Sequence, residues 1–174
     1  MLGANLLCAR SVRGVGAWLA LAFVAACGPQ SPTTSDVVIP FRNPTAQIGA
    51  ISRFDLSAFA GTWQVRRSAG GAWLLKTFAV QGNQWTEMGA GSALITERAT
   101  GRLTLAYDGG TARDLWVLWV DEGHDTVALG TPDGSFGFVA QRRGVTRTDQ
   151  VRAAAQVMDF NGYRTQDWTA SVLP

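Results

Sequence analysis

The sequence predicts an all-β fold: an eight-stranded up-and-down antiparallel β-barrel with one C-terminal helix packed on the barrel. Between residues 62 and 143, short apolar or alternating segments are separated about every eight to twelve residues by Gly, Asn or Asp, as in barrels and sandwiches. The alternation then stops, and apolar residues recur at helical spacing from 146 to 159. The 174 residues fit one ordinary domain and a short appendage.

Composition and charge exclude several classes of protein. The chain is 47% hydrophobic and 16% charged, so it can bury a sizeable core and is not a disordered or collagen-like polymer. The formal net charge is +2, and Arg10 and Arg13 lie in the first 26 residues. The remainder has 13 basic and 13 acidic side chains. A strongly basic nucleic-acid binder is therefore excluded.

Residues 1–26 have the layout of a bacterial lipoprotein signal peptide that is removed on export. Arg10 and Arg13 precede an apolar stretch, Val15 to Ala26, which is too short for a permanent transmembrane helix. The residues Val24-Ala25-Ala26-Cys27 resemble the lipobox, in which the cysteine thiol carries diacylglycerol. The alternative is an ordinary secretory signal with a chance cysteine. We expect lipidation of Cys27.

Residues 27–51 are expected to be the lipidated cysteine and a flexible tether, because four of the six prolines fall there among Ser, Thr, Gln and Asn. Residues 52–174 are expected to form the barrel domain. Cys8 is lost with the signal peptide and Cys27 is alkylated, so neither disulfides nor cysteine catalysis are available. By resemblance to enterobacterial lipoproteins, Gly28 rather than Asp favours the outer membrane, with the protein anchored there and facing the periplasm.

Eight strands are expected from the alternation, with turn residues such as Gly82-Asn83 and Pro132-Asp133-Gly134 between them. Their ranges are Thr62 to Ser68, Trp73 to Val80, Gln84 to Met88, Ala93 to Arg98, Arg102 to Tyr107, Arg113 to Asp121, Thr126 to Gly130 and Ser135 to Arg143. The helix follows at Thr146 to Asp159, with Thr146 and Asp149 as capping residues and Asn161-Gly162 at its end. Tyr163 to Trp168 is expected to return as a short ninth strand.

Four segments in order over this meander resemble the lipocalins, and in particular their bacterial outer-membrane lipoprotein branch. Gly61 and Trp63 form a Gly-x-Trp signature after Phe54, and Asp121 lies in a turn like that of the family's second region. The segment Phe136 to Arg142 is similar to the third region, which ends in arginine, and Asn161 to Thr165 is similar to the segment after the family's helix. The signature residues are thus Gly61, Trp63, Asp121 and Arg142.

An up-and-down meander places Trp63 and Arg142 at the same end of the barrel, here called the closed end. The guanidinium can lie over the indole and close that end. The opposite, open end is formed by the four loops around 68–72, 89–92, 108–112 and 131–134, which are mostly small or turn residues. An apolar molecule could enter there.

Period two places Leu103, Leu105 and Tyr107 on one face, and Phe136 and Phe138 on another. For the strand 113–121 we favour Leu115, Val117 and Trp119 as inward over Trp116 and Leu118. In the strand 73–80 the sets Trp73, Leu75, Thr77 and Leu74, Lys76, Phe78 remain equally possible. The expected ligand-binding residues are Leu105, Tyr107, Leu115, Val117, Phe136 and Phe138.

The lipocalin resemblance implies a membrane-anchored lipoprotein that binds a small apolar ligand, such as a fatty acid or lysophospholipid, for lipid transport or storage in envelope maintenance. The alternative is a barrel filled by its own side chains that binds a protein partner, for example as a protease inhibitor. No enzymatic activity, cofactor or metal is expected. His124 lies with Asp121, Glu122 and Asp125 on an expected closed-end turn, which favours a solvated hairpin over a metal site.

Overall fold

The computed structural model describes residues 41–70, 73–74 and 76–170. The expected signal peptide, Cys27 and the residues of the tether before Phe41 lie outside this range. No helix in the described part of the chain is long and apolar enough to span a membrane.

The described residues form nine strands and three short or medium helices. Their bounds are α1 (Leu56–Phe59), β1 (Gly61–Ser68), β2 (Thr77–Gln81), β3 (Gln84–Glu87), β4 (Gly91–Ala99), β5 (Arg102–Tyr107), β6 (Ala112–Val120), β7 (Thr126–Gly130), β8 (Gly137–Arg142), α2 (Thr148–Phe160), the 3-10 helix η1 (Thr165–Asp167) and β9 (Thr169–Ala170).

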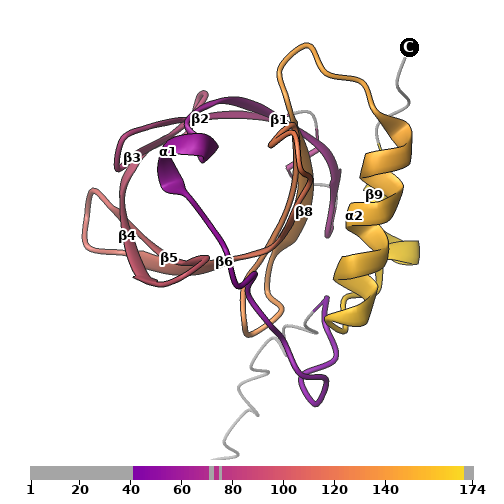
Figure 1. Cartoon of the computed structure of the whole chain (residues 1–174). Helices are drawn as coiled ribbons and strands as arrows, with labels where there is room; N and C mark the ends of the chain where they lie inside the picture. The colour runs from indigo at the N-terminus through magenta and orange to yellow at the C-terminus, as the bar shows by residue number, and fades with distance from the viewer. Residues whose placement is uncertain (1–40, 71–72, 75, 171–174) are drawn as a thin grey trace, which may run out of the picture. The chain divides into compact units, whose positions relative to one another are not determined.

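The first eight strands close into an antiparallel barrel, which confirms the predicted fold class. Each strand pairs with the next along the chain, and β1 pairs with both β2 and β8 to complete the ring. Figure 1 shows the ring of strands, with α2 outside it. The alternation located β5 and β7 at their observed bounds. The predicted start of β2 was wrong: the strand begins at Thr77, because Trp73 and Leu74 lie in a turn and the Lys76 N–H donates to the Trp73 carbonyl at 3.0 Å.

The helix α2 packs on β6, β7 and β8, as predicted. Val151, Ala154, Ala155 and Met158 are its buried face, and it ends at Phe160, followed by the C-cap Asn161 and by Gly162, whose φ is +86°. The predicted cap was wrong: Arg147 is the N-cap, without a side-chain capping bond, and its guanidinium pairs with Asp149 at 3.0 Å.

The ninth strand was also misplaced. The segment predicted as that strand, Tyr163 to Trp168, instead contains η1, because the Asp159 carboxylate accepts hydrogen bonds from the backbone and hydroxyl of Thr165 and holds the chain in a turn. The strand β9 follows it at Thr169–Ala170 and pairs with β1.

Two hydrophobic cores flank the barrel wall. The interior core consists of buried side chains from every barrel strand and from α1: Phe59, Trp63, Val65, Phe78, Val80, Trp85, Ala93, Ile95, Leu103, Leu105, Leu115, Val117, Val127, Leu129, Phe138 and Ala140. The outer core joins α2 to the wall, and Leu118, Ala128, Val139, Met158 and Tyr163 belong to it.

A bulge in β6 divides this strand between the two cores. Val117 pairs with Leu129, but Trp119, not Leu118, pairs with the next residue, Ala128. The extra residue reverses the alternation, because side chains beyond a bulge change faces. Leu115 and Val117 point inward as predicted, whereas Trp119 packs in the outer core, so its predicted inward placement was wrong. In β2, Phe78 and Val80 are the inward residues.

Residues 41–51, which composition assigns to the tether, contact the barrel at several points. The Phe41 N–H donates to the Gly134 carbonyl at 2.8 Å, and the Ile51 N–H donates to the Val117 carbonyl at 2.9 Å. Arg42 forms a β-bridge with Tyr163 and is 3% exposed. This segment therefore runs along the wall from the β7–β8 loop to the bulge of β6.

Candidate functional site at the open end of the barrel

The closed end is sealed by Arg142 and Trp63. The Arg142 guanidinium carbon lies 4.6 Å from the centre of the Trp63 ring, as the sequence predicts. Its three nitrogens donate to the carbonyls of Ala58, Ala60 and His124 at 2.6 to 2.8 Å. Gly61 is required beside it, because its φ is +135° and a Cβ there would collide with the guanidinium. The arginine thus joins β8 to α1 and to the β6–β7 turn.

Asp121 organises that β6–β7 turn. Its carboxylate is 7% exposed and accepts the N–H groups of Asp125 at 2.7 Å and Gly123 at 3.2 Å, together with the Gln150 amide of α2 at 3.0 Å. Thr126 and Gln141 extend the network toward the helix. These contacts of the Asp121 carboxylate indicate a structural role in the turn. Among the described residues, no group of three His, Cys, Asp or Glu is arranged to hold a metal.

A column of aromatic rings occupies the interior from one end to the other. Phe59 lies 5.0 Å from Trp63 at the closed end, and Phe78 stacks on Trp85 at 4.1 Å in the middle. Phe78 also meets Phe138 at 5.7 Å, and Trp73 covers Phe138 at 5.5 Å near the open end. Side chains therefore fill the axis of the barrel in this conformation.

At the open end, the carboxylate of Glu87 in β3 and the phenol of Tyr107 in β5 are in direct contact on the inner face of the barrel. The Tyr107 hydroxyl donates to Glu87 Oε1 at 2.6 Å, and the Trp85 indole N–H donates to the same oxygen at 3.2 Å. Burial raises the pKa of Tyr107, and the hydrogen bond and charge of Glu87 raise it further. The phenol therefore stays protonated, and Glu87 is held in place by two donors.

Arg113 lies beside Tyr107 at the mouth, on the neighbouring strand β6. Its guanidinium carbon lies 4.9 Å from the centre of the Phe136 ring and 5.9 Å from that of Tyr107. Trp73 meets Phe136 edge-on at 4.9 Å. These four side chains are half-buried, and Arg113 has no ion pair within the described part of the chain. The guanidinium is thus held by aromatic rings while its charge is unmatched.

Ser68 adds a polar atom just inside the mouth. It pairs with Phe138 across β1 and β8, which places its side chain on the inner face, and it is fully buried. Its hydroxyl oxygen has no hydrogen-bond partner in the described structure. A buried hydroxyl without a partner costs about 1–3 kcal/mol, so this atom can favour a polar group that reaches it.

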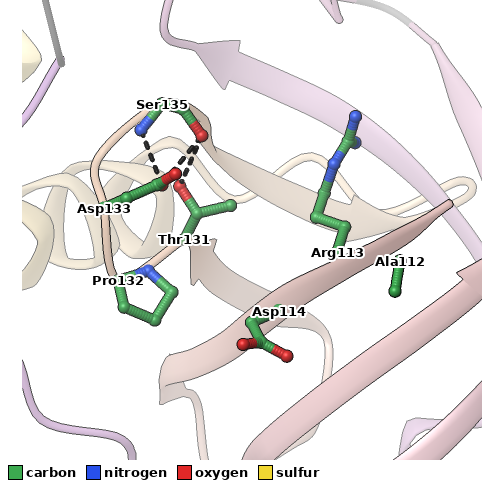
Figure 2. Close-up of a pocket in the computed structure, with 7 residues that line it drawn as sticks. All are labelled: Ala112, Arg113, Asp114, Thr131, Pro132, Asp133 and Ser135. Carbon is green, nitrogen blue, oxygen red and sulfur yellow. Dashed lines mark hydrogen bonds between the residues drawn. The ribbon is translucent and has the colours of Figure 1, made fainter.

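A cleft of about 320 Å³ opens in the barrel wall beside Arg113. It lies between the start of β6 and the β7–β8 loop, and Figure 2 shows Arg113 and Asp114 on opposite sides of the strand. Asp133 in the loop accepts the backbone N–H and hydroxyl of Ser135. Burial alone would raise the pKa of Asp133, but hydrogen bonds from Thr131 and Ser135 outweigh it and hold the pKa below its usual value.

The expected ligand-binding residues fall into two groups. Leu105, Leu115, Val117 and Phe138 are at most 1% exposed and belong to the interior core, whereas Tyr107 and Phe136 are half-buried at the mouth. Sequence reasoning missed Glu87, Arg113 and Ser68. The first two stand two residues from Trp85 and Leu115, so extending the alternation toward the open end would have found them.

Comparison with known proteins agrees with this architecture. No protein-family model and no curated protein matches the chain. Among solved structures, insecticyanin from the tobacco hornworm Manduca sexta is similar at 12% identity, over 74% of this chain and 85% of that one, with a TM-score of 0.55. The cockroach allergen Per a 4 is similar at 10% identity, over 74% and 94%, with a TM-score of 0.53.

The fold is that of the lipocalins. Sequence identities this low establish a shared fold, and they do not identify a ligand for this chain. Within the lipocalin fold of this chain, Gly61, Trp63, Asp121 and Arg142 all lie in the sealed half, and the unmatched polar groups Arg113 and Ser68 lie toward the open half.

Proposed function

We propose that the barrel binds a small amphipathic anion at its open end, with the charged head group at Arg113 and the apolar part directed toward Phe136 and Phe138. The observation that carries the proposal is the unmatched guanidinium of Arg113, held over Phe136 among half-buried aromatic rings. An arginine can bind a carboxylate or phosphate through two parallel hydrogen bonds. Fatty acids and lysophospholipids combine such a head group with an acyl chain.

Binding of the acyl chain requires side chains at the mouth to move. Trp73 covers Phe138, and Leu105, Leu115 and Val117 below it are almost inaccessible to water. Trp73 belongs to a loop rather than to β2, so it is the side chain that can leave with least loss of strand pairing. Burial of apolar surface contributes about 25 cal/mol per Å², which supports micromolar binding after the costs of association.

We expect Arg113→Gln to weaken the binding of a fatty acid about tenfold or more, because it removes charge-assisted hydrogen bonds worth about 1.5–3 kcal/mol. Tyr107→Ala and Phe136→Ala should also weaken it, through lost contacts at the mouth. The measurement is a titration of delipidated protein with fatty acid and with lysophospholipid, followed by tryptophan fluorescence and calorimetry. Arg98→Gln, an exposed change in the outer part of β4, is the matched control.

Two results would contradict this proposal in different ways. Absence of saturable binding below about 100 micromolar, a standard free energy of about 5.5 kcal/mol, would show that the barrel is not a receptor for these lipids. Equal affinities of Arg113→Gln and the parent would leave ligand binding intact and remove Arg113 from the site.

A second function, binding of a protein partner, is favoured by the filled interior. The ring contacts from Phe59 to Trp73 and the buried aliphatic residues are those of a packed core. A barrel of this kind would act through its loops rather than its cavity. The same titration separates the two functions, since a filled barrel gives no saturable lipid binding. Catalysis is not proposed, because the chain's single histidine, His124, lies on the closed-end turn.

We also propose that Cys27 is lipidated and holds the domain at the outer membrane of a bacterial cell, facing the periplasm, where it would transport or store lipid. The support is the lipobox of the sequence followed by a proline-rich segment. Acyl chains contribute about 0.8 kcal/mol per buried methylene, so two or three chains make a durable anchor.

Cys27→Ser is expected to move the protein from the membrane fraction to the soluble fraction of a bacterial host. Mass spectrometry of the parent should show acyl groups on Cys27. If the variant stays with membranes like the parent and the parent has no acyl mass, the lipidation of Cys27 is excluded.

A further inference from the structure

The chain leaves the barrel domain at the open end. The Phe41 N–H donates to the carbonyl of Gly134 in the β7–β8 loop. Its ring rests on Gly70 in the β1–β2 loop, where an added Cβ would lie 2.9 Å from the ring. Both loops belong to the open end. The N-terminal segment is therefore fixed between two loops of the mouth before it continues toward residue 40.

Arg42 fixes this exit point. Its side chain donates to the carbonyls of Ala46, Asn161 and Pro132, the last two at 2.6 and 3.2 Å. Gly134 and Gly162 have no room for a side chain, because a Cβ at either would lie against Arg42 or Ala46. The exit is thus part of the folded domain.

Two exposed apolar side chains lie at the same end. Met88 follows β3 in the β3–β4 turn and is 64% exposed, and Phe160 ends α2 and is 86% exposed. Phe160 precedes Asn161, whose carbonyl binds Arg42 beside the β7–β8 loop. The remaining large apolar residue that is exposed in the described part of the chain, Leu94, lies on the outer face of β4.

We propose that the open end docks on the surface of the lipid bilayer, with Met88 and Phe160 in contact with the interface. The proposal rests on the lipidation of Cys27 proposed above. The fourteen residue steps from Cys27 to Phe41 span at most about 50 Å when fully extended. The closed end of the barrel is farther from Phe41 than the open end by the length of a strand, up to about 30 Å for the nine residues of β6. The exit of the chain at Phe41 and the apolar rim therefore lie at the same end of the barrel, which is the end nearer to the anchor along the chain.

Charge does not direct this docking, because both signs occur around the mouth. Lys76 and Arg113 stand near Glu87, Asp108 and Asp133. Contact with the bilayer then depends on apolar insertion and is expected on neutral lipid. A mouth that touches the membrane can take up an acyl chain directly from it, without passage of the chain through water.

The test measures which end of the domain contacts the bilayer. The lipidated chain is reconstituted in phosphatidylcholine vesicles that contain a head-group nitroxide lipid, and single cysteines carry an environment-sensitive fluorophore. Alkylated Cys27 does not react with the label. Met88→Cys and Phe160→Cys report on the open end, and Thr100→Cys and Glu122→Cys report on the exposed closed-end turns. We expect quenching at 88 and 160 to exceed that at 100 and 122 about threefold, since interfacial groups insert about 5–10 Å.

A charge on the rim should abolish the difference. In Phe160→Asp, quenching of the label at 88 is expected to fall to the closed-end value, whereas the control Thr100→Asp leaves it unchanged. Equal quenching at all four positions, or greater quenching at 100 and 122, overturns the docking proposal.

Failure of the anchor is distinguished from failure of docking by a second preparation. A chain with Cys27→Ser and a histidine tag at that position is held on vesicles by a nickel-chelating lipid, and the same four labels are read. Preferential quenching at 88 and 160 supports docking even if the native chain has no acyl group. Its absence refutes docking even if native lipidation is found.

Discussion

Trp63→Ala is expected to lower the free energy of unfolding by about 3–5 kcal/mol, the range for removal of a buried aromatic side chain. Trp63 is fully buried, packs 5.0 Å from Phe59, and donates its indole N–H to the Phe59 carbonyl at 3.0 Å. Its loss would also remove the surface on which Arg142 lies. Urea unfolding followed by circular dichroism measures the change.

Arg142→Ala should cost less than Trp63→Ala, about 2 kcal/mol, since three backbone carbonyls lose their donor but water can reach the partly exposed site. Trp73→Ala, at the half-buried mouth, is the matched control and should unfold closer to the parent. If Trp63→Ala and Arg142→Ala instead unfolded like the parent and lost ligand, the two ends of the barrel would have to be exchanged.

Arg42→Ala is expected to lower the free energy of unfolding by about 3 kcal/mol, a large effect for a residue in a proline-rich, tether-like segment. The side chain is 3% exposed and serves carbonyls in its own segment, in the β7–β8 loop and at the end of α2. Hydrogen bonds from charged groups contribute about 1.5–3 kcal/mol each, and part of this is regained when water enters.

The control for Arg42 is Arg53→Ala, which changes an exposed arginine two residues after this segment. Thermal unfolding of both variants, with the parent, provides the measurement. Equal stability of Arg42→Ala and Arg53→Ala would show that the contacts of Arg42 do not hold the segment on the barrel.

Sequence reasoning succeeded where local chemistry decides the structure. Leu103, Leu105 and Tyr107 alternate without interruption between Gly101 and Asp108, so β5 was located at its bounds. The end of α2 was found because Gly162 supplies the positive φ that terminates a helix.

The errors arise where distant contacts override the local pattern. The bulge after Val117 adds one apolar residue among others, so nothing in the composition of β6 shows that Trp119 changes faces. Glu87 and Arg113 are polar residues in inward phase, which a simple polar-out pattern assigns to solvent. Residues 41–51 have the composition of a linker, and their packing is seen only in contacts with residues distant in sequence, such as those of Arg42 and Ile51.

The helix α2 is attached to both ends of the barrel by polar contacts as well as by its apolar face. Near its start, Gln150 binds the Asp121 carboxylate at the closed end, and just past its end the Tyr163 hydroxyl donates to the Thr131 and Phe136 carbonyls at the open end. Release of the helix would free both turns at once and expose the outer core. The helix and the barrel should consequently exchange their amide hydrogens as one cooperative unit. Local opening of the mouth that leaves the helix docked is then confined to the β1–β2, β3–β4 and β5–β6 loops.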